Sequence, residues 1–154
     1  MSRFNRDLMF STGYDEWETP QQIFDYFNDR FRFTLDVCAS PENAKVLRYF
    51  TKEQNGLFQD WSGEICWMNP PYSDNAKWVQ KAYRASLNPN TVVVCLLPSR
   101  TDTSWFHDYC AKGDIWFIRG RITFGNAKNV APFPSMIVIF PKNWEEIIKA
   151  KRNV

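Results

Sequence analysis

The sequence predicts an α/β fold in which a mainly parallel β-sheet carries helices on both faces. Short apolar stretches typical of strands alternate with stretches of helical periodicity, and this alternation indicates a parallel sheet. Residues 91–98 form a continuous apolar run rich in valine and leucine, as expected for a strand covered on both faces. The six strand candidates are residues 33–40, 45–50, 64–68, 91–98, 114–118 and 135–140.

The first predicted helix shows the chemistry of a helix start. Thr19 is the expected N-cap, Pro20 stands at the first helical position, and Gln22 completes a capping box. Apolar residues then recur at helical spacing as far as Phe31, which gives the helix one apolar face. Further helices are predicted over residues 73–87, 104–111 and 143–152.

Length and composition indicate one globular domain. The chain has 154 residues, and we expect a single domain over residues 1–154 with residues 1–16 as a flexible arm. A hydrophobic fraction of 44% and a charged fraction of 23% exclude the disordered and membrane classes. The N-terminus lacks the apolar stretch of a secretory signal, so we expect a cytoplasmic protein without a membrane partner.

Metal binding is not expected. The four cysteines have no short C-x-x-C spacing, and the chain contains a single histidine.

The formal net charge of +2 permits an anionic partner without requiring one. Several cationic residues fall in the loop-rich stretch 99–131, where they are candidates for contact with a polyanion. The alternative is that they are solubilising surface charges. The candidates are Arg100, Arg119, Arg121 and Lys128.

In an open α/β sheet, ligands bind beyond the carboxyl ends of the strands. This rule selects three segments that each follow a predicted strand, namely residues 36–40, 69–72 and 98–101. We therefore expect the functional residues to lie in these segments.

The tetrapeptide Asn69-Pro70-Pro71-Tyr72 follows the predicted strand 64–68 directly. Because proline has no N–H, the carbonyls of Asn69 and Pro70 are expected to lack ladder partners. Together with the Asn69 side-chain oxygen they can hold an exocyclic amine through both hydrogens, while the Tyr72 ring offers a face for stacking on a base. The alternative is an ordinary turn, since Asn-Pro and Pro-Pro are common turn dipeptides.

Six motifs in a fixed order resemble the phage and prophage DNA N6-adenine methyltransferase family, the Dam-like enzymes. The resemblance extends from about residue 17 to residue 140. It implies a Rossmann-like methyltransferase fold, S-adenosylmethionine as cofactor and adenine in double-stranded DNA as acceptor, in a phage or prophage protein of the bacterial host cytoplasm. The motifs are Thr19-Pro20, LDVCASPENAK (35–45), NGLFQDW (55–61), WMNPPYS (67–73), LLPSRTDTSWF (96–106) and GRITF with APFPSMIVIF (120–124 and 131–140).

The resemblance also implies roles for individual residues. Asn69, Pro70, Pro71 and Tyr72 match the catalytic tetrapeptide of the family. The residues that match cofactor-binding segments are Thr19, Pro20, Asp36, Cys38, Ala39 and Asp60, the last with Trp61 beside it.

Several of these residues have a structural alternative. Asp36 could cap a helix or turn, Asp60 could cap the turn before Gly63, and Trp61 could belong to the core. Glu53 follows the predicted strand 45–50, where an acidic residue can bind ribose hydroxyls; the alternative is a solvated loop charge.

The chain departs from many methyltransferases after the first strand, where it has residues 39–43 in place of a Gly-x-Gly turn. A cofactor loop of different shape is expected there.

Other acceptors fit the same tetrapeptide. The alternative functions are methylation of cytosine N4 or of a protein glutamine, and a DNA-binding accessory protein that has lost the chemistry.

Overall fold

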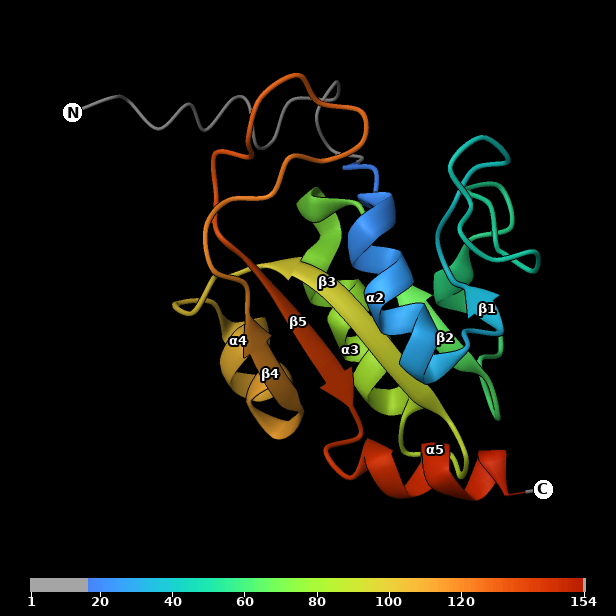
Figure 1. Cartoon of the computed structure of the whole chain (residues 1–154). Helices are drawn as coiled ribbons and strands as arrows, with labels where there is room; N and C mark the ends of the chain where they lie inside the picture. The colour runs from blue at the N-terminus through green and yellow to red at the C-terminus, as the bar shows by residue number, and fades with distance from the viewer. Residues whose placement is uncertain (1–16, 154) are drawn as a thin grey trace.

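Five strands form one mixed sheet in the order β1-β2-β3-β5-β4. The structure is a computed structural model that describes residues 17–153 (Figure 1). β1, β2 and β3 are parallel neighbours, while β5 runs antiparallel to both β3 and β4. The strands are β1 (Leu35–Asp36), β2 (Ile65–Met68), β3 (Val92–Pro98), β4 (Asp114–Phe117) and β5 (Ser135–Phe140).

Helices cover both faces of the sheet (Figure 1). Side chains of α2 (Gln21–Phe31) and α5 (Trp144–Arg152) share one apolar cluster, and those of α3 (Asn75–Ala85) and α4 (Ser104–Asp108) share the other. The short 3₁₀ helices are η1 (Gly56–Phe58), η2 (Tyr72–Asp74) and η3 (Cys110–Lys112).

Alternate residues of β3 supply the two clusters. Val92, Val94 and Leu96 pack in the cluster of α2. Val93, Cys95 and Leu97 pack in the cluster of α3. Because side chains alternate between the faces of a strand, this pattern is what a sheet covered on both sides requires, and the expectation of helices on both faces is confirmed.

Five of the six predicted strands are present, and the strand predicted over residues 45–50 is wrong. This segment pairs with β1 only through an isolated bridge between Asp36 and Tyr49. Its Leu47 side chain is fully exposed, at 101% of the reference area. The segment lies beside β1 as a loop, where the Asp36 backbone bonds to Arg48 and Phe50, and it forms no strand of the sheet.

The four predicted helices are present, but Thr19 does not cap the first one. α2 begins at Gln21 with Pro20 as its N-cap residue, and no side chain caps it. The capping box with Gln22 is therefore wrong. In contrast, the Thr103 hydroxyl accepts a hydrogen bond from the Phe106 amide at the start of α4, as an N-cap does.

Residues 1–16, expected to form an arm, lie outside the described residues. Within residues 17–153, no helix combines the length and the apolar character that a bilayer crossing needs.

Gly56 provides a test of the packing between η1 and the residue after β1. A Cβ atom at Gly56 would lie 2.1 Å from the carbonyl oxygen of Val37, a buried backbone atom that cannot move aside. We expect Gly56→Ala to lower the free energy of unfolding by about 1–3 kcal/mol, measured by urea titration.

The matched control lies in the same 3₁₀ helix. The Phe58 side chain is 84% exposed, so Phe58→Ala should change the free energy of unfolding by no more than about 0.5 kcal/mol. Equal effects of the two substitutions would contradict the close approach at Gly56.

Candidate functional site

A cavity of about 630 Å³ lies beyond the carboxyl ends of β1 and β2. Most of its lining comes from four chain segments, namely the residues before α2, the loop after β1, the stretch that leads into η1, and the turn after β2. Trp67 of β2 and Trp78 of α3 complete it. Two of the three predicted strand ends thus meet at one cavity. The third, residues 98–101, does not contribute to its lining.

Asp36 anchors the loop after β1. Its side chain is 3% exposed, and its two carboxylate oxygens accept hydrogen bonds from the backbone amides of Cys38 (3.4 Å) and Lys45 (3.2 Å). Burial raises the pKa of Asp36 to about 7, and these amides with the nearby Lys45 charge oppose that rise only in part. Asp36 therefore caps backbone amides of the loop, as its structural alternative proposed. It also lines the cavity.

The cavity is rich in acidic side chains. Five acidic side chains and one ammonium group are among the residues that line it. Because burial disfavours the charged form of Asp36, the other four acids carry most of the negative charge, which favours a cationic ligand. The charged residues are Glu18, Asp36, Glu42, Lys52, Glu53 and Asp74.

The Asn69 side chain is held from the segment before α2. Its Nδ2 donates to the backbone carbonyl of Trp17 and, at 2.9 Å, to the hydroxyl of Thr19. Its Oδ1 is buried and accepts no hydrogen bond from residues 17–153. A buried acceptor without a donor is uncommon in native proteins, and in a residue that lines a cavity it indicates a ligand contact.

The backbone carbonyl of Asn69 has a hydrogen-bond partner, although the sequence predicted that it would be free. It accepts a hydrogen bond from the Cys38 thiol at 3.3 Å, so it is not free. Cys38 thereby ties the loop after β1 to the tetrapeptide, and both residues line the cavity. Of the two acceptors expected on Asn69, only the side-chain oxygen is left without a partner.

Tyr72 does not offer the exposed ring face expected from the sequence. Its side chain is 6% exposed, and its ring packs edge-on against Phe124 and Phe133 with centroid distances of 6.2 and 5.4 Å. Its hydroxyl donates to the carbonyl of Leu96 at 3.3 Å, and burial raises the pKa of Tyr72. The ring thus supports the tetrapeptide from the apolar side.

Asp60 fits its structural alternative. It lies outside the cavity lining, and hydrogen bonds from the Ser62 side chain and from the Ser62 amide lower the pKa of Asp60. Trp61 is 1% exposed and belongs to the core. Pro20 and Pro70 also lie outside the lining, whereas Thr19, Ala39, Glu53 and Pro71 are part of it.

Asn55 and Gly56, which belong to the NGLFQDW motif, also line the cavity, although neither is among the predicted cofactor-binding residues. Asn55 has a left-handed backbone (φ 53°), and its side chain accepts from the Leu57 amide. An Asn-Gly dipeptide is a strong turn signal and was the available clue.

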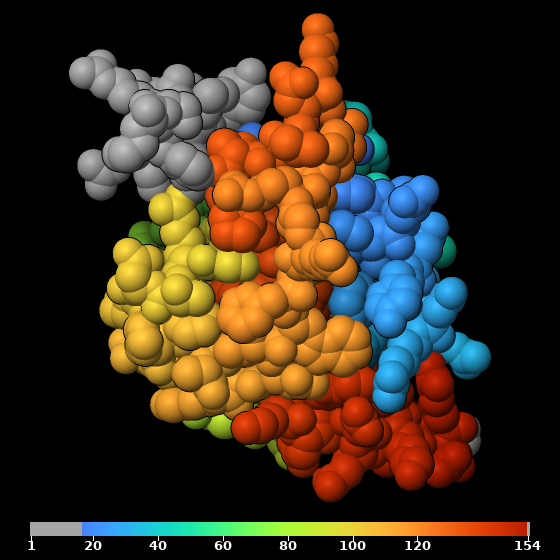
Figure 2. Space-filling model, turned by 60° about the vertical axis from the view of Figure 1, so that its left-hand side comes forward, coloured from blue at the N-terminus to red at the C-terminus, as the bar shows by residue number. Residues whose placement is uncertain are grey.

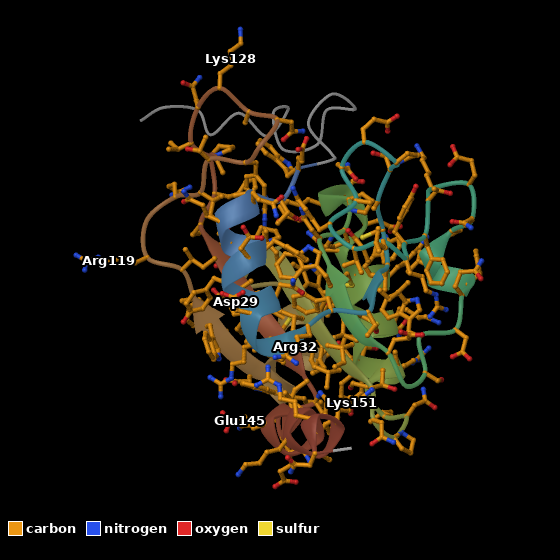
Figure 3. All side chains as sticks on the ribbon, turned by 45° about the vertical axis from the view of Figure 1, so that its right-hand side comes forward. Asp29, Arg32, Arg119, Lys128, Glu145 and Lys151 are labelled. Atoms are coloured by element: carbon orange, nitrogen blue, oxygen red, sulfur yellow. The ribbon has the colours of Figure 1, made fainter. Side chains whose placement is uncertain are left out.

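The cationic candidates lie away from the cavity. Arg119, Arg121 and Lys128 are exposed on the segment between β4 and β5, called here the 118–134 segment. This segment projects at the end of the molecule opposite α5 (Figure 2), and Arg119 and Lys128 extend from it into solvent (Figure 3). Arg100 is half-buried just after β3.

Over the described part of the chain, no three histidine, cysteine or acidic side chains are grouped in a way that could hold a metal ion.

A family model described as "DNA N-6-adenine-methyltransferase (Dam)" matches residues 9–152, which include every segment of the cavity. The chain belongs to this family. The resemblance predicted from the six motifs is thereby confirmed.

Two phage proteins of the Dam family illustrate the relationship. The DNA N-6-adenine-methyltransferase of Haemophilus phage HP1 is 40% identical over 136 residues, covering 82% of this chain and 78% of the phage protein. The DNA N-6-adenine-methyltransferase of Escherichia phage T1 is 34% identical over 94 residues, covering 60% of this chain and 39% of the phage protein.

The pKa of Asp36 leads to a prediction about stability. The charged form is disfavoured in the folded state, so the free energy of unfolding should fall as pH rises from about 4 to about 7 and then level off. Between pH 5 and pH 8 this decline amounts to about 2–3 kcal/mol. Asp36→Asn should remove it, as measured by urea titration at both pH values.

Asp60→Asn is the matched control. The pKa of Asp60 is lowered, so this residue is charged in both folded and unfolded states between pH 5 and pH 8. The substitution should leave the decline unchanged. A decline that persists in Asp36→Asn would refute the assignment to Asp36.

Proposed function

We propose that this chain transfers a methyl group from S-adenosylmethionine to the N6 amine of adenine in double-stranded DNA. The observation that carries the proposal is the buried Oδ1 of Asn69, an acceptor without a donor in a residue that lines the cavity. Membership of the Dam family and the names of the phage relatives agree with this chemistry. We further propose that residues 1–154 form one Rossmann-like methyltransferase domain that works in the bacterial cytoplasm.

The cavity fits a cationic nucleoside cofactor. Its acidic lining complements a positive charge, and Trp17 and Trp78 contribute aromatic surface suited to a purine. Glu53 lines the cavity and would accept ribose hydroxyls, while Asp36, Cys38 and Ala39 would border the cofactor from the loop after β1. When bound, S-adenosylmethionine supplies a methyl group on a positively charged sulfur that leaves as a neutral thioether.

Close packing of Gly56 helps to shape this cavity. Because a side chain at Gly56 would collide with the carbonyl of Val37 and approach Trp78, only glycine lets the backbone line the cavity at this point.

Asn69 orients the acceptor amine. The lone pair of adenine N6 is delocalised into the ring, so N6 is a weak nucleophile. A hydrogen bond from N6 to Asn69 Oδ1, with a second to the carbonyl of Pro70, would favour a pyramidal nitrogen and aim its lone pair at the methyl carbon. As the new C–N bond forms, the excess proton on N6 is lost to water.

The target base must leave the duplex to reach this position, at a cost of a few kcal/mol. Tyr72, buried beneath Phe124 and Phe133, would act by holding Asn69 and Pro70 in place from behind. The 118–134 segment, which carries both phenylalanines, would therefore stand next to the extruded base.

Backbone phosphates would contact the cations of the 118–134 segment. Arg119, Arg121 and Lys128 are exposed on it, and Arg100 follows the C-terminal end of β3. Arg119 and Lys128 extend from well-separated points of the segment (Figure 3). Phosphate contacts position a protein on DNA without reading its sequence.

The proposed function is tested by identifying the methylated base. Purified protein is incubated with tritiated S-adenosylmethionine and unmethylated duplex DNA, and the digested nucleosides are separated by chromatography. We expect the label in N6-methyladenine, and Asn69→Ala should lose transfer while it still binds the cofactor in calorimetry.

Other outcomes point to other functions. Label in N4-methylcytosine or in protein glutamine would change the acceptor. Cofactor binding without any transfer would indicate a silent accessory protein. Normal turnover by Asn69→Ala would remove the role of its Oδ1.

The cationic contacts predict a salt dependence. The double variant Arg119→Ala/Lys128→Ala should bind duplex DNA more weakly and reduce the slope of log K against log salt by about 2, one for each lost phosphate contact. Lys149→Ala, on α5 at the opposite end of the molecule, should leave the slope unchanged (Figure 1). Equal slopes for all three proteins would show that these residues are only solubilising charges.

A further inference from the structure

We infer that Thr19 is a positioning residue, which holds the Asn69 amide in the one orientation that presents its oxygen as an acceptor. This inference rests on the proposed function, because it concerns how Asn69 is prepared for the amine. It assigns to the segment before α2 a task in the reaction that is separate from cofactor binding.

The backbone carbonyl of Trp17 determines the orientation of the Asn69 side-chain amide. A backbone carbonyl can only accept hydrogen bonds, so the Asn69 atom beside it must be the nitrogen. Rotating the amide by half a turn would bring two oxygens together and lose this bond. The Oδ1 atom is thereby directed to the opposite side, where residues 17–153 provide no donor.

The hydroxyl of Thr19 completes the arrangement. It accepts from Asn69 Nδ2 at 2.9 Å and from the indole Nε1 of Trp67 at 3.2 Å. These two donors occupy both acceptor sites of the hydroxyl oxygen. Both hydrogens of the Asn69 amide are therefore engaged, one by Thr19 and one by Trp17, and the amide has no freedom to turn.

Trp67 makes the position of this hydroxyl rigid. Its side chain has no exposed area, and its ring packs against Phe24, Phe27 and Phe33 with centroid distances between 5.4 and 6.4 Å. Since indole N–H is only a donor, Trp67 holds the Thr19 oxygen as an acceptor. A chain of contacts thus connects the core beneath α2 to Asn69.

The wrong amide orientation would oppose the reaction. An NH₂ group in place of Oδ1 would face the hydrogens of the target amine, donor against donor, and the nitrogen lone pair would not be aimed. Thr19 is also not used as a helix cap, since α2 begins after Pro20 without a side-chain cap. Its hydroxyl is therefore committed to Asn69 and Trp67.

The experiment compares Thr19→Val, which keeps the shape and removes the hydroxyl, with Thr19→Ser, which keeps the hydroxyl. At saturating S-adenosylmethionine we expect Thr19→Val to lower kcat for DNA methylation about ten- to hundredfold, and Thr19→Ser to recover most of the loss. In the Asn69→Ala background, Thr19→Val should change the residual single-turnover rate by less than about twofold, because the two residues act through one another.

A control separates positioning from lost stability. Thr19→Val leaves two buried donors without an acceptor and should lower the melting temperature. Ile148→Ala, in α5, also lowers it without touching the cavity, and its kcat should stay within about twofold of the wild type at a temperature where both variants are folded.

Three results would overturn the positioning role. In the first, the kcat of Thr19→Val stays within about twofold of the wild type. In the second, Thr19→Ser is as slow as Thr19→Val. In the third, Thr19→Val lowers the single-turnover rate of Asn69→Ala by the same factor as it lowers that of the wild type. If wild-type protein methylates no adenine, the proposed function fails separately. The NMR resonances of the Asn69 amide, identified by their absence in Asn69→Ala, then decide: a shift in Thr19→Val supports positioning, and no shift overturns it.

Discussion

Burial of β3 on both faces is the constraint on which the rest of the structure depends. All seven residues of the strand, Val92–Pro98, are buried, and alternate side chains pack under helices on opposite sides. A shift of one residue would exchange the two apolar sets, so the register of β3 is strongly determined. Its parallel neighbours β2 and β1 then end at the same edge, and this places the residues after Asp36 and Met68 side by side.

Burial determines the properties of two polar groups at this edge, the Asp36 carboxyl and the side-chain oxygen of Asn69. Burial that raises the pKa of Asp36 also makes an unpaired oxygen on Asn69 costly. This unfavourable burial is offset when the protein folds, before any ligand binds. The Asp36 carboxylate is held by backbone amides, and the Asn69 amide is held by a backbone carbonyl and a hydroxyl, all of which keep their positions. Fixed dipoles of this kind are effective in a site because no reorganisation is needed when charge moves.

The sheet, its helices and the position of residues 69–72 after a strand could be predicted from the sequence. Hydrophobic periodicity and proline each depend on the local backbone conformation, so they can be recognised without the tertiary structure. A hydrogen bond between residues far apart in the chain produces no pattern in the local sequence. Thr19 carries the pattern of an N-cap, yet its hydroxyl bonds to Asn69, fifty residues away in sequence. Tyr72 was expected to be open because the 118–134 segment that covers it has no periodicity from which to place Phe124 and Phe133. Residues 45–50 are apolar enough for a strand. Whether such a segment forms a strand or a loop depends on its pairing with the rest of the sheet, which here is a single bridge.

The antiparallel direction of β5 has a consequence for how this protein can diversify. β4 runs in the direction of β3 and ends at Phe117, whereas β5 begins at Ser135, and both points lie at the edge that holds the cavity. The 118–134 segment therefore leaves and re-enters the sheet at the same edge without crossing it (Figure 1). Phe124 and Phe133 of this segment are buried against Tyr72, whereas residues such as Arg119 and Lys128 are exposed. The exposed residues can change while the strand register and the buried contacts stay intact, so surface recognition can evolve separately from the chemistry beneath.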